Sequence, residues 1–73
     1  MDKNSEKAER FRKLAEKRTN EVLKKLKILG NCSNRSVYEY SQSDIVKIFS
    51  AIDSKIREAK ARFRFPKHKK FKL

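Results

Sequence analysis

The sequence predicts an all-α protein: a two-helix antiparallel hairpin with a long structured loop and a basic C-terminal tail. Apolar residues recur at helical spacing in two segments, about 5–29 and about 42–64. The chain's one glycine, Gly30, and its one proline, Pro66, each follow one of these segments. We therefore expect a helical hairpin over residues 1–63 and a basic extension over residues 64–73.

The first helix is predicted from a stripe of apolar side chains along one face. Its members are Phe11, Ala15, Val22, Leu26 and Leu29. Gly30 follows directly, where a residue without a side chain can adopt the left-handed conformation that caps many helices. We expect the helix to end at that point.

The second helix is predicted from a seam of apolar residues that are alternately four and three positions apart. The seam consists of Ile45, Phe49, Ile52, Ile56, Ala59 and Phe63. Ser41 with Asp44, or Ser43 directly before Asp44, can cap its start. Both stripes cover about 27 Å at 1.5 Å per residue, and this equal length predicts the antiparallel hairpin.

The charge of the chain indicates a polyanionic partner. Lys and Arg number 21 against nine Asp and Glu, so the formal net charge is +12, and polyphosphate backbones are common ligands of such an excess. A chain of 73 residues has room for one small core, so we expect no deep catalytic cleft and no enzyme activity. The small core also favours stabilisation by a partner: RNA, another protein, or a second copy bound through the apolar helix faces.

Other chemistry is not indicated. Cys32 and His68 are each the single residue of their kind, so we expect no internal disulfide, catalytic residue, metal site or cofactor. No apolar run approaches the roughly 18 residues that a membrane span requires, and the N-terminus is charged where a secretory signal would be apolar. We therefore expect a cytoplasmic protein that does not enter a membrane.

Five cations of the first helix are expected to form a ridge opposite its apolar stripe. This basic ridge consists of Arg10, Lys13, Lys17, Lys24 and Lys27. Successive cations are roughly 5–10 Å apart, comparable to phosphate spacings in nucleic acids. The ridge is therefore a candidate nucleic-acid-binding surface, and the alternative is the ordinary solvated face of an amphipathic helix.

Two further segments are candidates for nucleic-acid contacts. In the loop, Arg35 can bind a phosphate or a guanine edge and Tyr38 can stack on a base; for the tyrosines, capping the open end of the hairpin is the favoured alternative. In the tail, cations alternate with phenylalanines that can stack on unpaired bases. The tail candidates are Arg62, Arg64, Phe65, Lys67, Lys69, Lys70, Phe71 and Lys72. A solubilising tail and a membrane-surface anchor are the alternatives here.

The stretch from Leu29 to Phe49 resembles small proteins of bacterial mobile elements, and the basic tail is similar in style to the extensions of small ribosomal proteins. The first resemblance implies no chemistry, and it rests on Gly30, Asn31, Ser33, Asn34, Arg35, Ser36, Tyr38 and Tyr40. Three functions agree with the residues. The first is an RNA-binding structural component of a ribonucleoprotein assembly such as the ribosome. The second is a phage or mobile-element accessory protein or inhibitor that binds a nucleic-acid-guided enzyme or its RNA, and the third is a small dimeric DNA-binding regulator.

Overall fold

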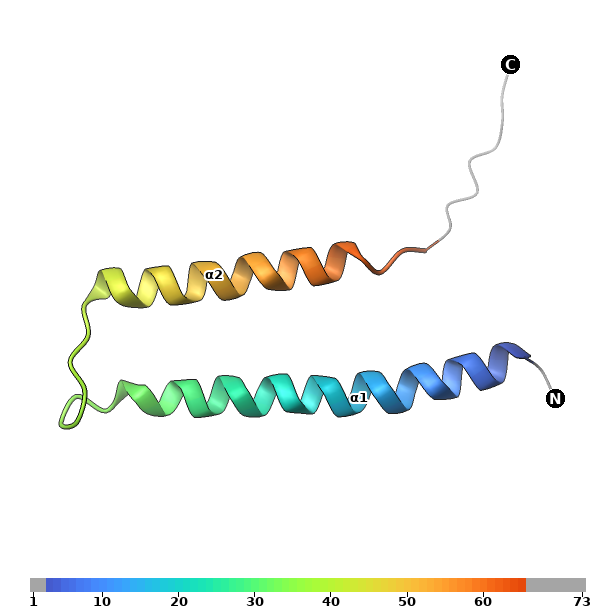
Figure 1. Ribbon diagram of the computed structural model, residues 1–73, viewed down its shortest axis with the longest axis horizontal. Helices are drawn as coiled ribbons and strands as arrows, with labels where there is room; N and C mark the ends of the chain where they lie inside the picture. Colours follow the sequence, from blue (N-terminus) through green and yellow to red (C-terminus); the bar gives the residue numbers. More distant parts are fainter. Residues whose placement is uncertain (1–2, 66–73) are drawn as a thin grey trace, which may run out of the picture. The chain divides into compact units, whose positions relative to one another are not determined.

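The computed structural model of the protein describes residues 3–65, with the side chains of residues 5–65. It has two α-helices, α1 (Lys3–Gly30) and α2 (Gln42–Ala61), and a short 3-10 helix, η1 (Asn31–Ser33), directly after α1 (Figure 1). These described residues contain no strand, so the prediction of two helices is confirmed for this part of the chain. The chain divides into two units, residues 1–39 with α1 and η1, and residues 40–73 with α2.

The end of α1 differs from the prediction. Gly30 has φ −59° and ψ −26°, which is the right-handed helical conformation, and no described residue has a positive φ. The expected left-handed glycine cap is therefore wrong. The backbone instead tightens into η1, a common way to satisfy the last carbonyl groups of a helix. The helical path ends at Asn34, which is extended at φ −69° and ψ 103°.

Asn34 organises the turn that follows η1. Its backbone oxygen accepts hydrogen bonds from the Val37 and Tyr38 N–H groups, at 3.2 and 2.9 Å. Its side-chain Oδ1 accepts from the Ser36 N–H at 3.1 Å and also from the Ser36 hydroxyl. These hydrogen bonds give residues 34–38 a defined conformation, because an Asn side chain can replace a backbone group in a turn.

The start of α2 is a complete capping box. The Asp44 N–H donates to Ser41 Oγ at 3.1 Å, and the Ser41 N–H donates to Asp44 Oδ2 at 2.9 Å. Of the two caps considered from the sequence, the structure therefore contains the one with Ser41. The backbone N–H of Ser41, and then its side chain, hold the pKa of the Asp44 carboxyl below its ordinary value, because these hydrogen bonds favour the charged form.

The end of α2 comes earlier than predicted. The helix ends at Ala61, so the predicted boundary at 64 is wrong and Phe63, the last member of the seam, lies beyond the helix. The Arg62 N–H donates to Ala59 O and the Phe63 N–H to Lys60 O, both at 3.1 Å. These three-residue bonds tighten and close the last turn.

The two apolar stripes contain the most covered side chains of each helix. Among the described residues no side chain is buried, and the half-buried ones on the helices belong to the predicted stripes. They are Ala15, Leu26 and Leu29 in α1 and Ile45 and Ile52 in α2. Other members, such as Phe11, Val22 and Phe49, are exposed. Each helix therefore presents an amphipathic face with apolar area still accessible.

Candidate polyanion-binding surface

The basic ridge lies entirely on α1, and all five of its side chains are exposed. Because α1 is one continuous helix of 28 residues, it holds these cations in a fixed order along one line. From Arg10 to Lys27 the ridge is about 25 Å long at 1.5 Å per residue. The structure therefore places all five predicted ridge residues on one rigid element.

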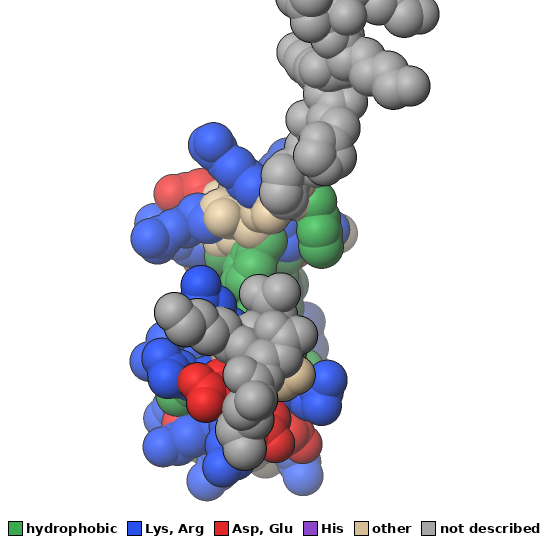
Figure 2. Space-filling model, turned by 90° about the vertical axis from the view of Figure 1, so that its right-hand side faces the viewer, with side chains coloured by type: hydrophobic (Ala, Val, Ile, Leu, Met, Phe, Trp, Pro, Cys, Tyr) green, Lys and Arg blue, Asp and Glu red, His purple; other side chains and the backbone are tan. Residues whose placement is uncertain are grey.

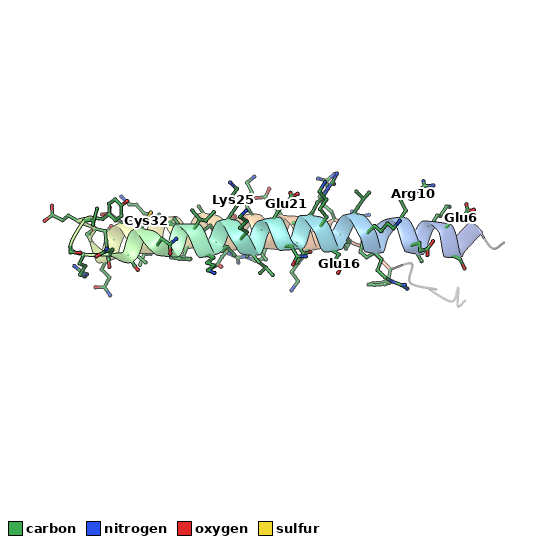
Figure 3. All side chains as sticks on the ribbon, turned by 90° about the horizontal axis from the view of Figure 1, so that it is seen from below. Glu6, Arg10, Glu16, Glu21, Lys25 and Cys32 are labelled. Atoms are coloured by element: carbon green, nitrogen blue, oxygen red, sulfur yellow. The ribbon has the colours of Figure 1, made fainter. Side chains whose placement is uncertain are left out.

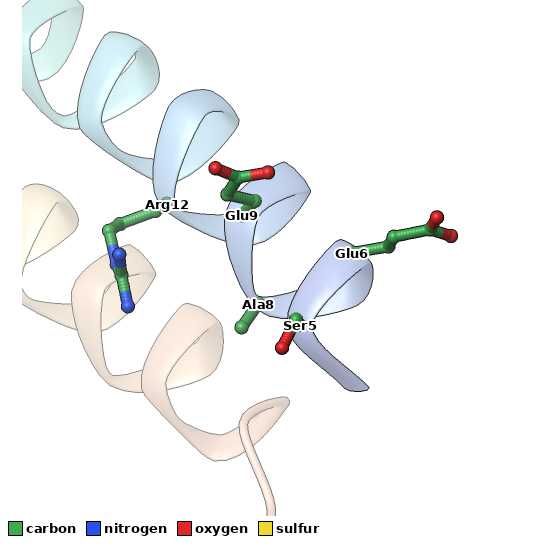
Figure 4. A pocket seen from close by; sticks show the side chains of 5 residues that line it. All are labelled: Ser5, Glu6, Ala8, Glu9 and Arg12. Carbon is green, nitrogen blue, oxygen red and sulfur yellow. The ribbon is translucent and has the colours of Figure 1, made fainter. Parts of the chain in front are cut away.

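The N-terminal end of the ridge is mixed in charge. Glu6 and Glu9 line a surface hollow together with Arg10 and Lys13. A neighbouring hollow is lined by Ser5, Glu6, Ala8, Glu9 and Arg12, where both glutamates project away from the side that bears Ser5, Ala8 and Arg12 (Figure 4). The two carboxylates offset the charge of the first ridge cations, so the end near Arg10 is a weaker place for a polyanion than the sequence suggests.

The C-terminal part of the ridge is more strongly basic. Lys17, Lys24 and Lys27 are bordered by one acid on each side, Glu16 and Glu21, which project from opposite edges of α1 (Figure 3). Neither acid lies in the line of the three lysines. At 100° per residue, each glutamate is rotated about 60° or more around the α1 axis from the middle of that line. We therefore assign the strongest part of the basic ridge to Lys17, Lys24 and Lys27.

A second basic row on α1 was not predicted. Lys7, Arg18 and Lys25 are exposed, and their spacing of 11 and seven residues brings them to one side of the helix, about 120° around the axis from the ridge. Lys25 and Glu21 project from the same edge (Figure 3). The signal was present in the sequence, because the same helical periodicity that defines the ridge also defines this row.

The charge of the chain is unevenly distributed. The segment Lys3–Gly30 contains ten Lys and Arg against four Glu, a net charge of +6. Residues 31–61 have a net charge of only +1, and residues 62–73 contain six cations and no acid. In Figure 2, Lys and Arg side chains project from the helices in several directions, with acidic side chains among them. The basic surface of α1 is consequently wider than one ridge.

The loop candidates lie in the turn that Asn34 organises, in the same unit as α1. Arg35 is exposed on the first position of this turn, and Tyr38, which donates its N–H to Asn34, has a side chain that is 51% exposed. Tyr40 is half-buried. Among these three residues, Arg35 and Tyr38 are thus the ones presented to solvent, and Tyr38 could stack on a base.

The tail candidates belong to the second unit. Arg62 follows the last residue of α2, and Arg64 and Phe65 are exposed, with Phe65 at 89%. The remaining tail candidates lie outside the described residues: Lys67, Lys69, Lys70, Phe71 and Lys72. Beyond Arg62, the described residues therefore offer a ligand one cation, Arg64, and two exposed aromatic rings, Phe63 and Phe65.

Within residues 5–65, no group of three His, Cys, Asp or Glu side chains is placed to hold a metal ion. Cys32 is a free, exposed thiol. No helix in the described part of the chain is both long and apolar enough to cross a lipid bilayer. What these residues offer a ligand is positive charge on a helical scaffold.

Comparison with known proteins found no match to a family model, to a curated protein or to a solved structure. The function is therefore inferred from the chain's own residues.

Proposed function

We propose that this protein binds RNA and acts as a small structural component of a ribonucleoprotein assembly. The observation behind the proposal is the composition of α1, where ten cations against four acids stand on one continuous helix. Lys17, Lys24 and Lys27 supply the centre of the surface. An ordinary solvated helix face would have a more even balance of acids and bases, as α2 does with four cations and three acids.

Binding follows from counterion release. Each Lys or Arg that contacts a phosphate displaces a condensed cation from the RNA, and the affinity then depends steeply on salt. Contacts of this kind position a protein without selecting a sequence. Arg35, Tyr38 and the aromatic residues of the tail add stacking and directed hydrogen bonds at unpaired bases.

We also propose that the apolar faces of α1 and α2 pair as an antiparallel hairpin. Support comes from the accessible apolar side chains that each helix presents on its stripe, Phe11 and Val22 on α1 and Phe49 and Ile56 on α2. Pairing these faces removes apolar area from water. It leaves the basic ridge uncovered, because the ridge lies on the opposite side of α1 from the stripe.

The proposal is tested with two variants of the full chain that have the same charge change. In the first, Lys17, Lys24 and Lys27 are replaced by Gln, which has a helix propensity close to that of Lys. In the control, Lys47, Arg57 and Lys60 of α2 are replaced by Gln. Binding to one structured RNA is measured at about 50 and about 200 mM salt.

The ridge variant is expected to bind the RNA far more weakly than the control. Its slope of log affinity against log salt should fall by about 0.7 to 0.9 for each phosphate that is no longer neutralised, so by roughly 2 to 3 in total. Equal weakening in the two variants would mean that net charge alone determines binding, and the assignment of the ridge would then be wrong.

A further inference from the structure

We infer that α1 binds in the groove of a double-helical nucleic acid, with the basic ridge against one phosphate row and the second basic row against the other. This inference rests on the proposed nucleic-acid binding and names the form of the ligand. The shared chemistry is two facing rows of phosphates, which either a DNA or an RNA duplex supplies.

The two rows of cations on α1 are separated by a wide angle around the helix axis. Lys17, Lys24 and Lys27 lie about 120° around the α1 axis from the second basic row of Lys7, Arg18 and Lys25, at 100° per residue. A single row would suit one phosphate strand on one side of the helix. Two rows that diverge by about a third of a turn suit two strands that pass on either side of it.

The side chains between these two rows are mainly apolar. Leu14, Glu21 and Ile28 follow one another at intervals of seven residues and lie between the two rows. Leu14 is 46% and Ile28 48% exposed, and both lie outside the apolar stripe of α1. Pairing with α2 through that stripe would therefore not cover these two apolar side chains.

These three side chains suit the floor of a groove. Leu14 and Ile28 can contact apolar parts of base edges, such as a thymine methyl group, and the Glu21 carboxylate can accept a hydrogen bond from a cytosine amino group. A carboxylate that faced a phosphate row would instead weaken binding. The position of Glu21 between the rows, at the same edge as Lys25 (Figure 3), avoids most of that cost.

The dimensions agree with this placement. An α-helix with its side chains is about 10–12 Å across, and the major groove of B-form DNA, about 12 Å wide, admits one. The second basic row covers about 27 Å from Lys7 to Lys25, so it is long enough to reach several phosphates along one edge of a groove. The major groove of A-form RNA is deep and narrow, so an RNA ligand would need a duplex with a widened groove.

The test uses four nucleic acids and three variants of the full chain. The ligands are a DNA duplex of about 20 base pairs, longer than the cation rows, an RNA hairpin with an internal bulge, and a single strand of each chemistry. The variants are the ridge set (Lys17, Lys24 and Lys27 to Gln), the second-row set (Lys7, Arg18 and Lys25 to Gln), and the α2 control set (Lys47, Arg57 and Lys60 to Gln). Polyglutamate serves as an acidic polypeptide competitor.

On a duplex, the ridge set and the second-row set are each expected to lower the salt slope by about 2 to 3, and the α2 set by much less. A single strand has only one row of phosphates, so only one of the two α1 sets should lower the salt slope on single strands. Circular dichroism of the bound variants checks that α1 remains helical. A preference for the DNA duplex would support groove binding and overturn RNA as the natural ligand, whereas a preference for the bulged RNA would support both proposals.

Two results would overturn the inference. If the second-row set behaves like the α2 set on both duplexes while the ridge set still weakens binding, groove binding is wrong and the proposed function stands. If the unmodified chain binds none of the nucleic acids at about 50 mM salt, or if polyglutamate displaces all of them at equal charge, the proposed function is wrong as well.

Discussion

Individual side chains set the boundaries of the regular structure in this protein. Asn34 Oδ1 accepts hydrogen bonds from the N–H and the hydroxyl of Ser36 and so stabilises the turn after η1. Ser41 exchanges hydrogen bonds with Asp44 and so determines where α2 begins. A polar side chain that pairs with backbone groups only a few residues away therefore has more influence on these boundaries than the glycine of the chain has.

Gly30 offers a direct test of this view at the residue scale. Because Gly30 is right-handed helical and a Cβ atom there would meet nothing within 4 Å, Gly30→Ala should stabilise the end of α1 by about 0.5–1 kcal/mol through its better helix propensity. Far-ultraviolet circular dichroism should show equal or higher helical content. A decrease in helicity would indicate that Gly30 adopts the left-handed cap conformation in solution, where alanine is strained.

The capping box of α2 predicts a pH dependence. The pKa of Asp44 is lowered from an ordinary value of 3.8, so its contribution to stability is present above that value and is lost as the pH falls through the lower folded pKa. Asp44→Ala should therefore reduce helical content at neutral pH, and the difference from the unmodified chain should vanish in strong acid. Circular dichroism over that pH range measures it; a difference that does not change with pH would contradict the role of the charged carboxylate.

At the scale of the elements, the two helices differ in the balance of their charges. The ten cations of α1 repel one another and only four acids offset them, whereas α2 has a balanced composition, a capping box, and the Lys55 and Glu58 side chains 3.5 Å apart. The ion pair between Lys55 and Glu58 is exposed and adds little to the stability of α2 by itself. The stability of α1 should therefore respond much more strongly to bound anions.

Added polyanion is expected to raise the helical content of the chain, and mainly that of α1. A short RNA that neutralises the repelling cations should bind the helical form preferentially and so shift the equilibrium toward it. Backbone chemical shifts recorded with and without RNA should change over residues 3–30 more than over residues 42–61. Equal helicity of both segments without RNA, and no change on its addition, would contradict the argument from charge repulsion.

The sequence was sufficient to predict the helical segments and one cap, because these depend on periodicity and on contacts between near neighbours. The half-buried residues Ala15, Leu26, Ile45 and Ile52 all belong to predicted stripes. The end of α2 was misplaced, because the apolar seam continues to Phe63 although the backbone leaves the helix after Ala61. Periodicity describes side chains, and it does not contain the three-residue hydrogen bonds that close a helix.

The candidate surface was predictable only in part, for a similar reason. The ridge is defined by its position opposite the apolar stripe, so that definition leaves out cations beside the stripe, such as Arg18 and Lys25. It also leaves out the offsetting charge of Glu9 beside Arg10. A division into one apolar and one basic face is too simple for α1, because Lys7, Arg18 and Lys25 form a second exposed row about 120° from the ridge.

At the scale of the whole molecule, the proposed hairpin can be tested by crosslinking. In a chain with Cys32→Ser, the pair Ala15→Cys and Ala59→Cys occupies small positions of the two stripes that face each other in the proposed hairpin, and a short bifunctional thiol reagent should join them within one chain. The pair Ala15→Cys and Ser54→Cys is the control, since Ser54 lies on the opposite side of α2 from its seam.

Three outcomes of this experiment differ clearly on a non-reducing gel. A fast-migrating monomer from the Ala59 pair alone supports the hairpin. A crosslinked dimer from that pair assigns the apolar faces to a second copy of the chain. Similar, weak crosslinking from both pairs would contradict pairing of the stripes in either form.

The most direct test of the central claim is sedimentation of a tagged chain from lysates of its own host, with and without ribonuclease. We expect the chain to travel with a large particle and to be released from it by ribonuclease. Replacing Lys17, Lys24 and Lys27 by Gln should also release it, whereas the α2 control set should not. A chain that stays at the top of the gradient in every sample, or in a particle that ribonuclease leaves intact, would contradict it.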